Sequence, residues 1–223
     1  MREGLLLITA ACLAGCPGPQ DPSAPDADPG LDSNQDDGSS SDSKLRIEWA
    51  TTPEIPGTTT SGHRLDDVRF RMENLKATVD VDPNDPNTTR DEVKLHWNAE
   101  EAPEALTFSD APAGRYTQIV LKLDEGDGED SFEFRGVSNQ GDSFRLGDTA
   151  TISIAMTCNF VILPGETKTV TVNIDVQDAV DTVDIEALES GEGVDHHLDA
   201  DDNPAVAAQL RTALQAAFSV REK

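Results

Sequence analysis

Apolar and polar residues alternate along much of the chain between residues 44 and 176. Shorter runs with a period of two begin at Leu45, Val68 and Val93, and others cover 116–123, 132–134 and 144–146. A period of two is typical of a strand with one buried face. The longest run places an apolar side chain at every second position, at Ile152, Ile154, Met156, Cys158, Phe160 and Ile162.

A turn signal follows this longest run. Leu163-Pro164-Gly165-Glu166 separates it from a second alternating run at 170–176. Proline presets the backbone at the first central position of a turn, and glycine accepts the positive φ that a type II turn needs at the second. The pattern predicts a hairpin that pairs the two flanking strands, with Cys158 on the buried face.

Roughly eight to ten short strands, separated by turn-rich pieces such as 110–114 and 125–128, predict a mainly β fold, an antiparallel β-sandwich over residues 44–223. Strands do not alternate with helices along the chain, so the pattern does not favour a parallel sheet. A second short helix around 179–188 competes with a strand. A C-terminal α-helix is indicated by Asn203 as cap, Pro204 at the first helical position, and an apolar stripe at Val206, Leu210, Leu214, Ala217 and Phe218.

The first 15 residues have the features of an export signal. Residues 5–14 form an apolar run that is too short to span a bilayer. The run ends in Leu13-Ala14-Gly15-Cys16, which resembles the lipobox of bacterial lipoproteins. That resemblance implies cleavage before Cys16 and lipid on the Cys16 thiol. The alternative is an ordinary cleaved signal peptide that happens to have small residues at its end.

Residues 16–43 are expected to be a lipidated cysteine followed by an acidic linker. From 17 to 43 the chain carries seven acidic residues, no lysine or arginine, and Leu31 as the only large apolar side chain. Such a segment buries too little apolar surface to offset the entropy lost on folding. We expect an extended, disordered spacer between the membrane and the domain.

The whole chain carries a net charge of −26, and residues 44–223 contain 35 acidic and 16 basic residues. Nucleic acid is therefore excluded as a partner, because binding it requires lysine and arginine to replace counterions. The acidity favours either solubility or the attraction of cations and basic partners. With Cys12 in the signal and Cys16 lipidated, Cys158 has no partner for a disulfide within the mature chain.

The order of turns and strands resembles a family. It is carried by Gly114-Arg115-Tyr116-Thr117, Phe134-Arg135-Gly136, Phe144, Leu163-Pro164-Gly165 and the helix that begins at Asn203. This order resembles secreted β-sandwich lipoproteins of unassigned function from myxobacteria and related environmental bacteria, over most of residues 44–220. The resemblance implies the fold and the lipid anchor, and it implies no activity.

Calcium is the first candidate ligand. Asp80, Asp82 and Asn84 place oxygen ligands at alternate positions, as in an EF-hand loop, and Asp91 stands at the twelfth position. Asp85 stands where that motif uses glycine. The alternative is an acidic surface loop without an ion, because such loops arise freely in an acidic chain.

Two other clusters carry possible chemistry. His196-His197 lies among Asp195, Asp199, Asp201 and Asp202, and this is either a transition-metal site or an exposed polar loop. His96 lies on the polar face of its strand, where a solvated side chain is expected. Ser61-Gly62-His63 is the closest approach to a serine–histidine pair, and a hydrolase would need it in a cleft with a carboxylate.

The sequence predicts a lipid-anchored cell-envelope protein that acts as a non-catalytic binding or scaffolding module. Its only contact with the membrane would be the lipid on Cys16, and a protein, glycan or cation is the expected kind of partner. Pro17 rather than aspartate follows the cysteine, so the outer membrane is the default location. A structural lipoprotein with a calcium-stabilised loop and an unrecognised hydrolase are the alternatives.

Overall fold

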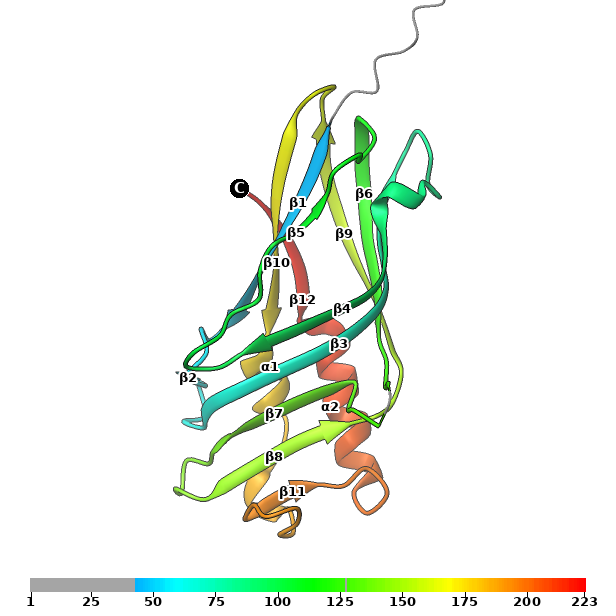
Figure 1. Ribbon diagram of the computed structural model, residues 1–223. Helices are drawn as coiled ribbons and strands as arrows, with labels where there is room; N and C mark the ends of the chain where they lie inside the picture. The colour runs from blue at the N-terminus through cyan, green and yellow to red at the C-terminus, as the bar shows by residue number, and fades with distance from the viewer. Residues whose placement is uncertain (1–42, 127) are drawn as a thin grey trace, which may run out of the picture. The chain divides into compact units, whose positions relative to one another are not determined.

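The computed structural model describes residues 43–126 and 128–223, so the predicted signal peptide, the lipobox, Cys16 and the linker lie outside the described residues. The described chain is mainly β, with two sheets packed as a sandwich and mostly antiparallel strands, as predicted (Figure 1). Its strands are β1 (Lys44–Thr52), β2 (Gly57–Thr58), β3 (Arg64–Val79), β4 (Thr89–Trp97), β5 (Leu106–Phe108), β6 (Gly114–Leu123), β7 (Phe132–Val137), β8 (Ser143–Asp148), β9 (Ile152–Ile162), β10 (Thr167–Asp175), β11 (His196–Leu198) and β12 (Phe218–Glu222).

The smaller sheet has the order β12-β10-β1-β5. The larger one has eight strands, in the order β11-β8-β7-β3-β6-β9 with β2 and β4 also paired to β3. The helices are α1 (Val176–Val180) and α2 (Pro204–Ala217), and two 3₁₀ turns are η1 (Pro86–Thr88) and η2 (Ile185–Ala187). Two pairings are parallel, β1 with β10 and β8 with β11, which the sequence did not predict.

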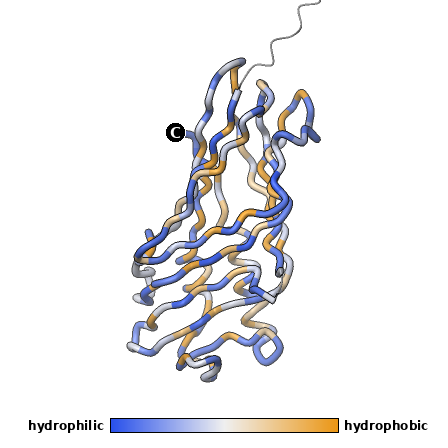
Figure 2. Tube along the Cα trace, in the orientation of Figure 1, coloured by the Kyte–Doolittle hydropathy of each residue, from blue (hydrophilic) through white to orange (hydrophobic). Residues whose placement is uncertain are grey.

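The alternation of the strands builds the core between the layers, and Figure 2 shows apolar and polar positions succeeding each other along the strands. Phe70 of the larger sheet packs edge-on against Phe134 at 5.7 Å and against Phe218, at the start of β12, also at 5.7 Å between ring centroids. Phe218 thus joins the smaller sheet to the larger across the core. Aromatic pairs at this spacing and tilt add to the free energy gained from burial.

The long strand β3 changes its inward face at an irregularity. Val68, Phe70 and Met72 are buried at even positions, whereas Leu75 and Ala77 are buried at odd ones. The change falls at Asn74, which has a φ of 51°, where the register against β6 shifts. A β-bulge of this kind inserts one residue and restores the buried face beyond it. The alternation predicted from the sequence therefore covers only the part of β3 that contains Val68, Phe70 and Met72.

The hairpin predicted between the runs at 152–162 and 170–176 is wrong, although its turn is present. Gly165 has a φ of 76°, and the Glu166 amide donates to the Leu163 carbonyl at 3.0 Å. β9, however, pairs with β6 in the larger sheet, while β10 pairs with β1 and β12 in the smaller one. The turn carries the chain from one layer to the other, because both runs have an apolar face that either layer can bury.

The C-terminal helix is present, with Asn203 at its cap and Pro204 at its first position, but the Asn203 side chain makes no capping hydrogen bond. The helix ends at Ala217, and Phe218 begins the added strand β12. Arg211 fastens α2 to the larger sheet by donating to both carboxylate oxygens of Asp148 at 2.6 and 3.0 Å. In Figure 1 both helices lie behind β7 and β8, so they cover the inner side of these strands and leave the other side open.

Candidate functional site

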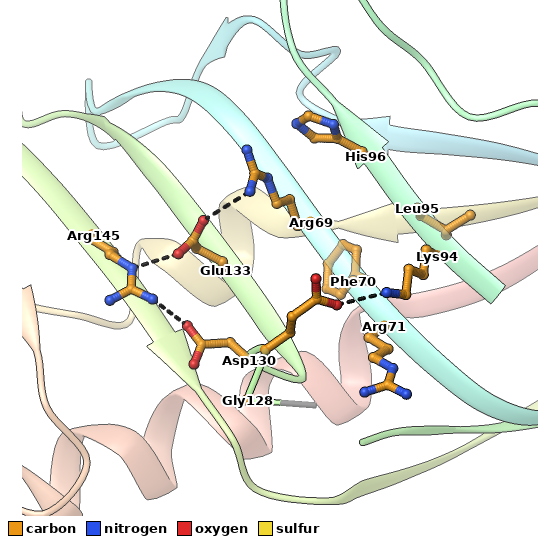
Figure 3. A pocket seen from close by; sticks show the side chains of 11 residues that line it. Arg69, Phe70, Arg71, Lys94, Leu95, His96, Gly128, Asp130, Glu133 and Arg145 are labelled. Carbon is orange, nitrogen blue, oxygen red and sulfur yellow. Dashed lines mark hydrogen bonds and ion pairs between the residues drawn. The ribbon is translucent and has the colours of Figure 1, made fainter. Parts of the chain in front are cut away.

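The open face of the larger sheet carries a hollow of about 380 Å³, which we call the charged hollow (Figure 3). Strands β3, β4, β7 and β8 form its floor, and residues 128–130 form one wall. The lining residues are Arg69, Phe70, Arg71, Lys94, Leu95, His96, Gly128, Glu129, Asp130, Glu133 and Arg145.

The period of two that builds the core also builds this hollow. Phe70 and Leu95 are buried in the core, and their neighbours along β3 and β4 therefore point to the opposite face. Because adjacent strands are only about 4.8 Å apart, charged side chains on this face lie within reach of one another across the strands. The prediction of the core rests on the apolar half of this alternation, and the charged half, which that prediction left out, lines the hollow.

Glu133 on β7 is at the centre of the ion pairs, and only 8% of its side chain is exposed. It accepts hydrogen bonds from Arg135 at 2.8 and 2.9 Å and from Arg145 at 2.5 Å. Burial by itself would raise the pKa of the Glu133 carboxyl, but the guanidinium groups of Arg135 and Arg145 outweigh burial and hold that pKa below its usual value. Glu133 is therefore held as a carboxylate.

Arg145 on β8 holds several acidic side chains, with 15% of its own side chain exposed. Besides Glu133 it donates to Asp130 at 2.7 Å, and it also pairs with Glu192. Burial raises the pKa of the Asp130 carboxyl in spite of the lowering effect of Arg145. The pKa values of Glu133 and Asp130 are thus shifted in opposite directions, because Glu133 has two arginines, whereas Asp130 has one and also lies near the carboxylates of Glu133 and Asp148.

Arg71 and Lys94 form the other side of the hollow. Arg71 Nε donates to Glu92 at 2.9 Å, and Lys94 Nζ donates to Glu129 at 2.7 Å. The Arg71 guanidinium lies so close to the backbone of Gly126 that a Cβ there would be 0.7 Å from Nη1. A larger residue at position 126 would require the end of the Arg71 side chain to move.

The charge of the hollow differs from that of the domain. Its lining has four arginines and lysines against three acidic residues, whereas residues 44–223 have 16 against 35. The four basic side chains gathered in the hollow offset part of the domain's negative charge at this place, although each of them is also paired with a carboxylate. Rigid strands carry these side chains, which favours a binding site over a loop with many conformations.

His96, expected to be solvated, is instead half-buried at the edge of the hollow. Its Nε2 lies 2.8 Å from Asp67 and its Nδ1 lies 2.8 Å from Glu101. The ring therefore joins β4 to β3 and to the segment that follows Asn98.

The predicted calcium ligands are engaged within the protein. The carboxylate of Asp80 accepts from the Arg115 amide at 3.0 Å, that of Asp82 accepts from the Asn84 amide at 3.1 Å, and the Asn84 carbonyl accepts from Lys76 Nζ at 2.8 Å. Asp91 is exposed on β4. In the described part of the chain, the carboxylates of Asp80, Asp82 and Asp91 do not form a group with mutual distances within 4.8 Å. Calcium in this loop stays a prediction.

The two adjacent histidines separate in β11. His196 Nε2 lies 3.2 Å from Glu186 and 3.8 Å from Asp142, whereas His197 Nε2 lies near Glu192 at 3.7 Å. We call Asp142, Glu186 and His196 the histidine cluster. Its acidic members, Asp142 and Glu186, are distant in sequence from His196. Of the aspartates around the histidines, Asp195 accepts hydrogen bonds from Ser143, and Asp199 accepts from the Asp201 amide.

The serine–histidine pair gives no support to a hydrolase. His63 is buried, its Nδ1 accepts from the Asn139 amide at 3.2 Å, and its ring packs edge-on against Phe144 at 6.2 Å. The Ser61 amide and the neighbouring Thr60 hydroxyl donate instead to Asp181. Both members of the pair therefore have structural partners.

Cys158 is half-buried rather than fully buried, because it lies where the register of β9 shifts against β6. Burial raises the pKa of its thiol to about 11. A thiol with this pKa is almost entirely protonated at neutral pH, so Cys158 is a poor nucleophile.

Comparison with family models, with curated proteins and with solved structures finds no match to this chain. Within residues 43–126 and 128–223, no helix has the length and the apolar character needed to cross a membrane. The site must therefore be interpreted from its own residues.

Proposed function

We propose that this protein is a lipid-anchored component of the bacterial cell envelope, and that it acts as a non-catalytic module which binds an anionic group of an envelope partner in the charged hollow. The observation that carries the binding role is the hollow itself, a concave surface on rigid strands with a local excess of basic residues in an acidic domain. Binding sites of small groups are typically concave and hold a few convergent polar side chains.

The anchor rests on the residues that resemble a lipobox, Leu13-Ala14-Gly15-Cys16. Multiple acyl chains on Cys16 would hold the protein stably at a membrane, by default the outer one, and the acidic linker would separate the domain from it. The test is a fractionation of bacteria that express the full chain. The unchanged protein is expected in the membrane fraction and Cys16→Ser in the soluble envelope fraction. A soluble unchanged protein would contradict the anchor.

The binding role is tested with dextran sulfate, an anionic polymer, and with uncharged dextran. A domain of this net charge should repel dextran sulfate unless a local site attracts it. Residues 17–223 are expected to bind dextran sulfate and not dextran. Arg69→Gln combined with Lys94→Gln should weaken binding at least about tenfold, because both side chains are half-exposed in the hollow and each contributes a charge.

Lys44→Gln is the matched control, because Lys44 is an exposed lysine on β1 of the other sheet. It should leave the affinity for dextran sulfate within about twofold. Equal losses in the two variants, or no binding by the unchanged protein, would argue against an anionic ligand in the hollow and leave a purely scaffolding role.

A further inference from the structure

The histidine cluster brings together side chains from three separate segments, at the edge of the larger sheet. Asp142 ends the turn between β7 and β8, Glu186 lies in η2, and His196 begins β11, which pairs with β8. One ligand atom from each lies within 4.8 Å of the other two. Among the described residues, no other group of three histidine, cysteine or acidic side chains has its ligand atoms within 4.8 Å of one another.

The orientation of the His196 ring is fixed by its other nitrogen. Nδ1 lies 3.1 Å from the Leu188 carbonyl oxygen, which can only accept a hydrogen bond, so Nδ1 carries a proton. In the neutral ring the lone pair is then on Nε2, which faces the two carboxylates. A histidine that ligates a metal has this arrangement, because its second nitrogen commonly donates to a backbone carbonyl or a carboxylate.

Nε2 itself is left without a hydrogen bond. It is buried, in a side chain with only 13% exposure, and no hydrogen-bond partner is found for it among the described residues. The Glu186 oxygen at 3.2 Å is near enough for attraction but lies in the wrong direction for a hydrogen bond. A buried nitrogen without a partner costs free energy, and a lone pair beside two carboxylates adds repulsion. A cation between the three groups would remove both costs.

The distances suit a small transition-metal ion. Zinc bound to nitrogen and oxygen at about 2.0–2.1 Å in a tetrahedron separates neighbouring ligand atoms by about 3.3 Å. The separations from His196 Nε2 are 3.2 Å to Glu186 and 3.8 Å to Asp142. In the part of the chain that the structure describes, no lysine or arginine pairs with Asp142 or Glu186, so their charges are not neutralised from within.

The residues beside the cluster hold it in place. Asp195, next to His196, accepts from the amide and hydroxyl of Ser143 at 2.9 and 2.7 Å, and its own amide donates to the Ser143 carbonyl at 3.1 Å. Ser143 in turn follows Asp142. These bonds fix the spacing between two of the three ligands before any ion binds, which is what a specific metal site requires.

We infer that Asp142, Glu186 and His196 form a binding site for a divalent transition-metal ion, with zinc as the best match to one imidazole and two carboxylates. The site is separate from the charged hollow. Three protein ligands leave one tetrahedral position of the ion free for another ligand. Water or a group on a partner can reach this position, because the Asp142 side chain is 53% exposed.

The test is a titration of residues 17–223 with Zn²⁺ by calorimetry and with Co²⁺ by visible absorption, at neutral pH and with about 5 mM Ca²⁺ present throughout, because calcium prefers oxygen ligands and should not compete for imidazole. One ion per chain is expected, and Co²⁺ should give the intense visible band of a four-coordinate site. His196→Ala should abolish this binding. Asp142→Asn and Glu186→Gln should each weaken it at least about tenfold.

His197→Ala is the matched control, because His197 is the neighbouring histidine and lies outside the cluster. Its affinity for Zn²⁺ should stay within about threefold of the unchanged protein. Asp142 lies in an exposed turn, so Asp142→Asn should leave the protein folded. Circular dichroism checks that each variant is folded, so that a loss of Zn²⁺ binding is not caused by unfolding. The inference is overturned if the unchanged protein binds no stoichiometric ion, or if His197→Ala loses as much affinity as His196→Ala.

Discussion

The charged hollow and the histidine cluster lie on the same sheet, and both bring carboxylates close together. In the hollow, Asp130 and Glu133 meet the guanidinium of Arg145 at 2.7 and 2.5 Å. In the histidine cluster, Asp142 and Glu186 meet a histidine nitrogen that has no hydrogen-bond partner within residues 43–126 and 128–223. The carboxylates of the hollow are neutralised by the chain itself, and those of the histidine cluster offer their charge to an ion from outside.

This difference is hard to see in the sequence, because both regions contain clustered carboxylates and Arg145 is only three residues from Asp142. It arises from where β8 directs its side chains. Arg145 points across the open face of the sheet to Glu133, while Asp142 lies in the turn before the strand and faces η2 and β11. A carboxylate cluster is therefore a candidate cation site only after the internal cations have been placed.

The largest expected effect comes from removing the internal cation. Arg145→Ala should lower the free energy of unfolding by about 3 kcal/mol, because it leaves the buried Glu133 and Asp130 carboxylates with fewer partners. Arg64→Ala is the control, since Arg64 and Asp66 form a pair with both members exposed, which solvent screens, and its loss should be much smaller. Urea denaturation measures both. Equal losses would show that the hollow is not held by its buried ion pairs.

The second effect is a pH dependence of stability that originates in Glu133. The pKa of Glu133 is lowered in the folded protein, so its carboxylate contributes stability above the unfolded pKa, and that contribution is lost as the pH falls through the lowered folded pKa. Glu133→Gln should cost about 2 kcal/mol at pH 7, and the difference from the unchanged protein should shrink in acid below about pH 4.

Comparing the two proteins isolates Glu133 from Asp130, whose raised pKa acts in the opposite direction. Urea denaturation at several pH values between neutrality and acid gives the measurement. A difference that grows as the pH falls would mean that burial, and not the two arginines, determines the protonation of Glu133.

The fold could be predicted from the sequence to the extent that it depends on alternation. The mainly β class, the strands around Phe70 and Phe160, and the C-terminal helix all follow from the periodicity of apolar residues. The pairing of β9 and β10 could not be predicted, because two runs with equally apolar faces joined by a tight turn can form a hairpin or enter opposite sheets. Which of these two arrangements forms depends on the pairing of β10 with β1, a strand more than a hundred residues earlier in the sequence.

The candidate sites show the same limit. The hollow could have been found from the charged residues that alternate with Phe70 and Leu95, since the same period predicts both faces. The histidine cluster could not, because Glu186 and Asp142 are brought to His196 by the packing of η2 and by the parallel pairing of β11 with β8. The signal available in sequence, a pair of adjacent histidines, pointed to His196 but not to Asp142 and Glu186, the carboxylates that lie beside its ring.

A third prediction concerns the histidine cluster without metal. In the presence of a chelator, Glu186→Gln should raise the free energy of unfolding by about 1 kcal/mol, because a neutral amide in place of the carboxylate removes the repulsion between its charge and the lone pair of His196 Nε2. The same variant weakens Zn²⁺ binding. A gain of stability with a loss of affinity is the signature of a site whose ligands repel one another, whereas a loss of stability in chelator would contradict that account. Thermal and urea unfolding measure the change.

The smallest effect is expected in the loop that sequence analysis proposed for calcium. It resembles the hollow more than the histidine cluster, because Lys76 Nζ already binds the Asn84 oxygen and the Arg115 amide already binds Asp80. Asp82→Ala should cost only about 0.5 kcal/mol, the worth of the turn that its carboxylate closes on the Asn84 amide. Calcium at about 1 mM should shift the melting temperature of residues 17–223 by less than about 1 °C.

The same melting experiment can contradict this likeness between the loop at 80–91 and the charged hollow. A rise in melting temperature with calcium concentration that Asp80→Ala and Asp82→Ala abolish would make the loop a calcium site, because only a ligand bound to the folded state stabilises it in this way. Lys76 would then have to release Asn84, so Lys76→Ala should strengthen the calcium effect. If Lys76→Ala instead leaves the melting temperature independent of calcium, the spacing of Asp80, Asp82, Asn84 and Asp91 resembles a calcium loop without the convergence of oxygens that binding requires.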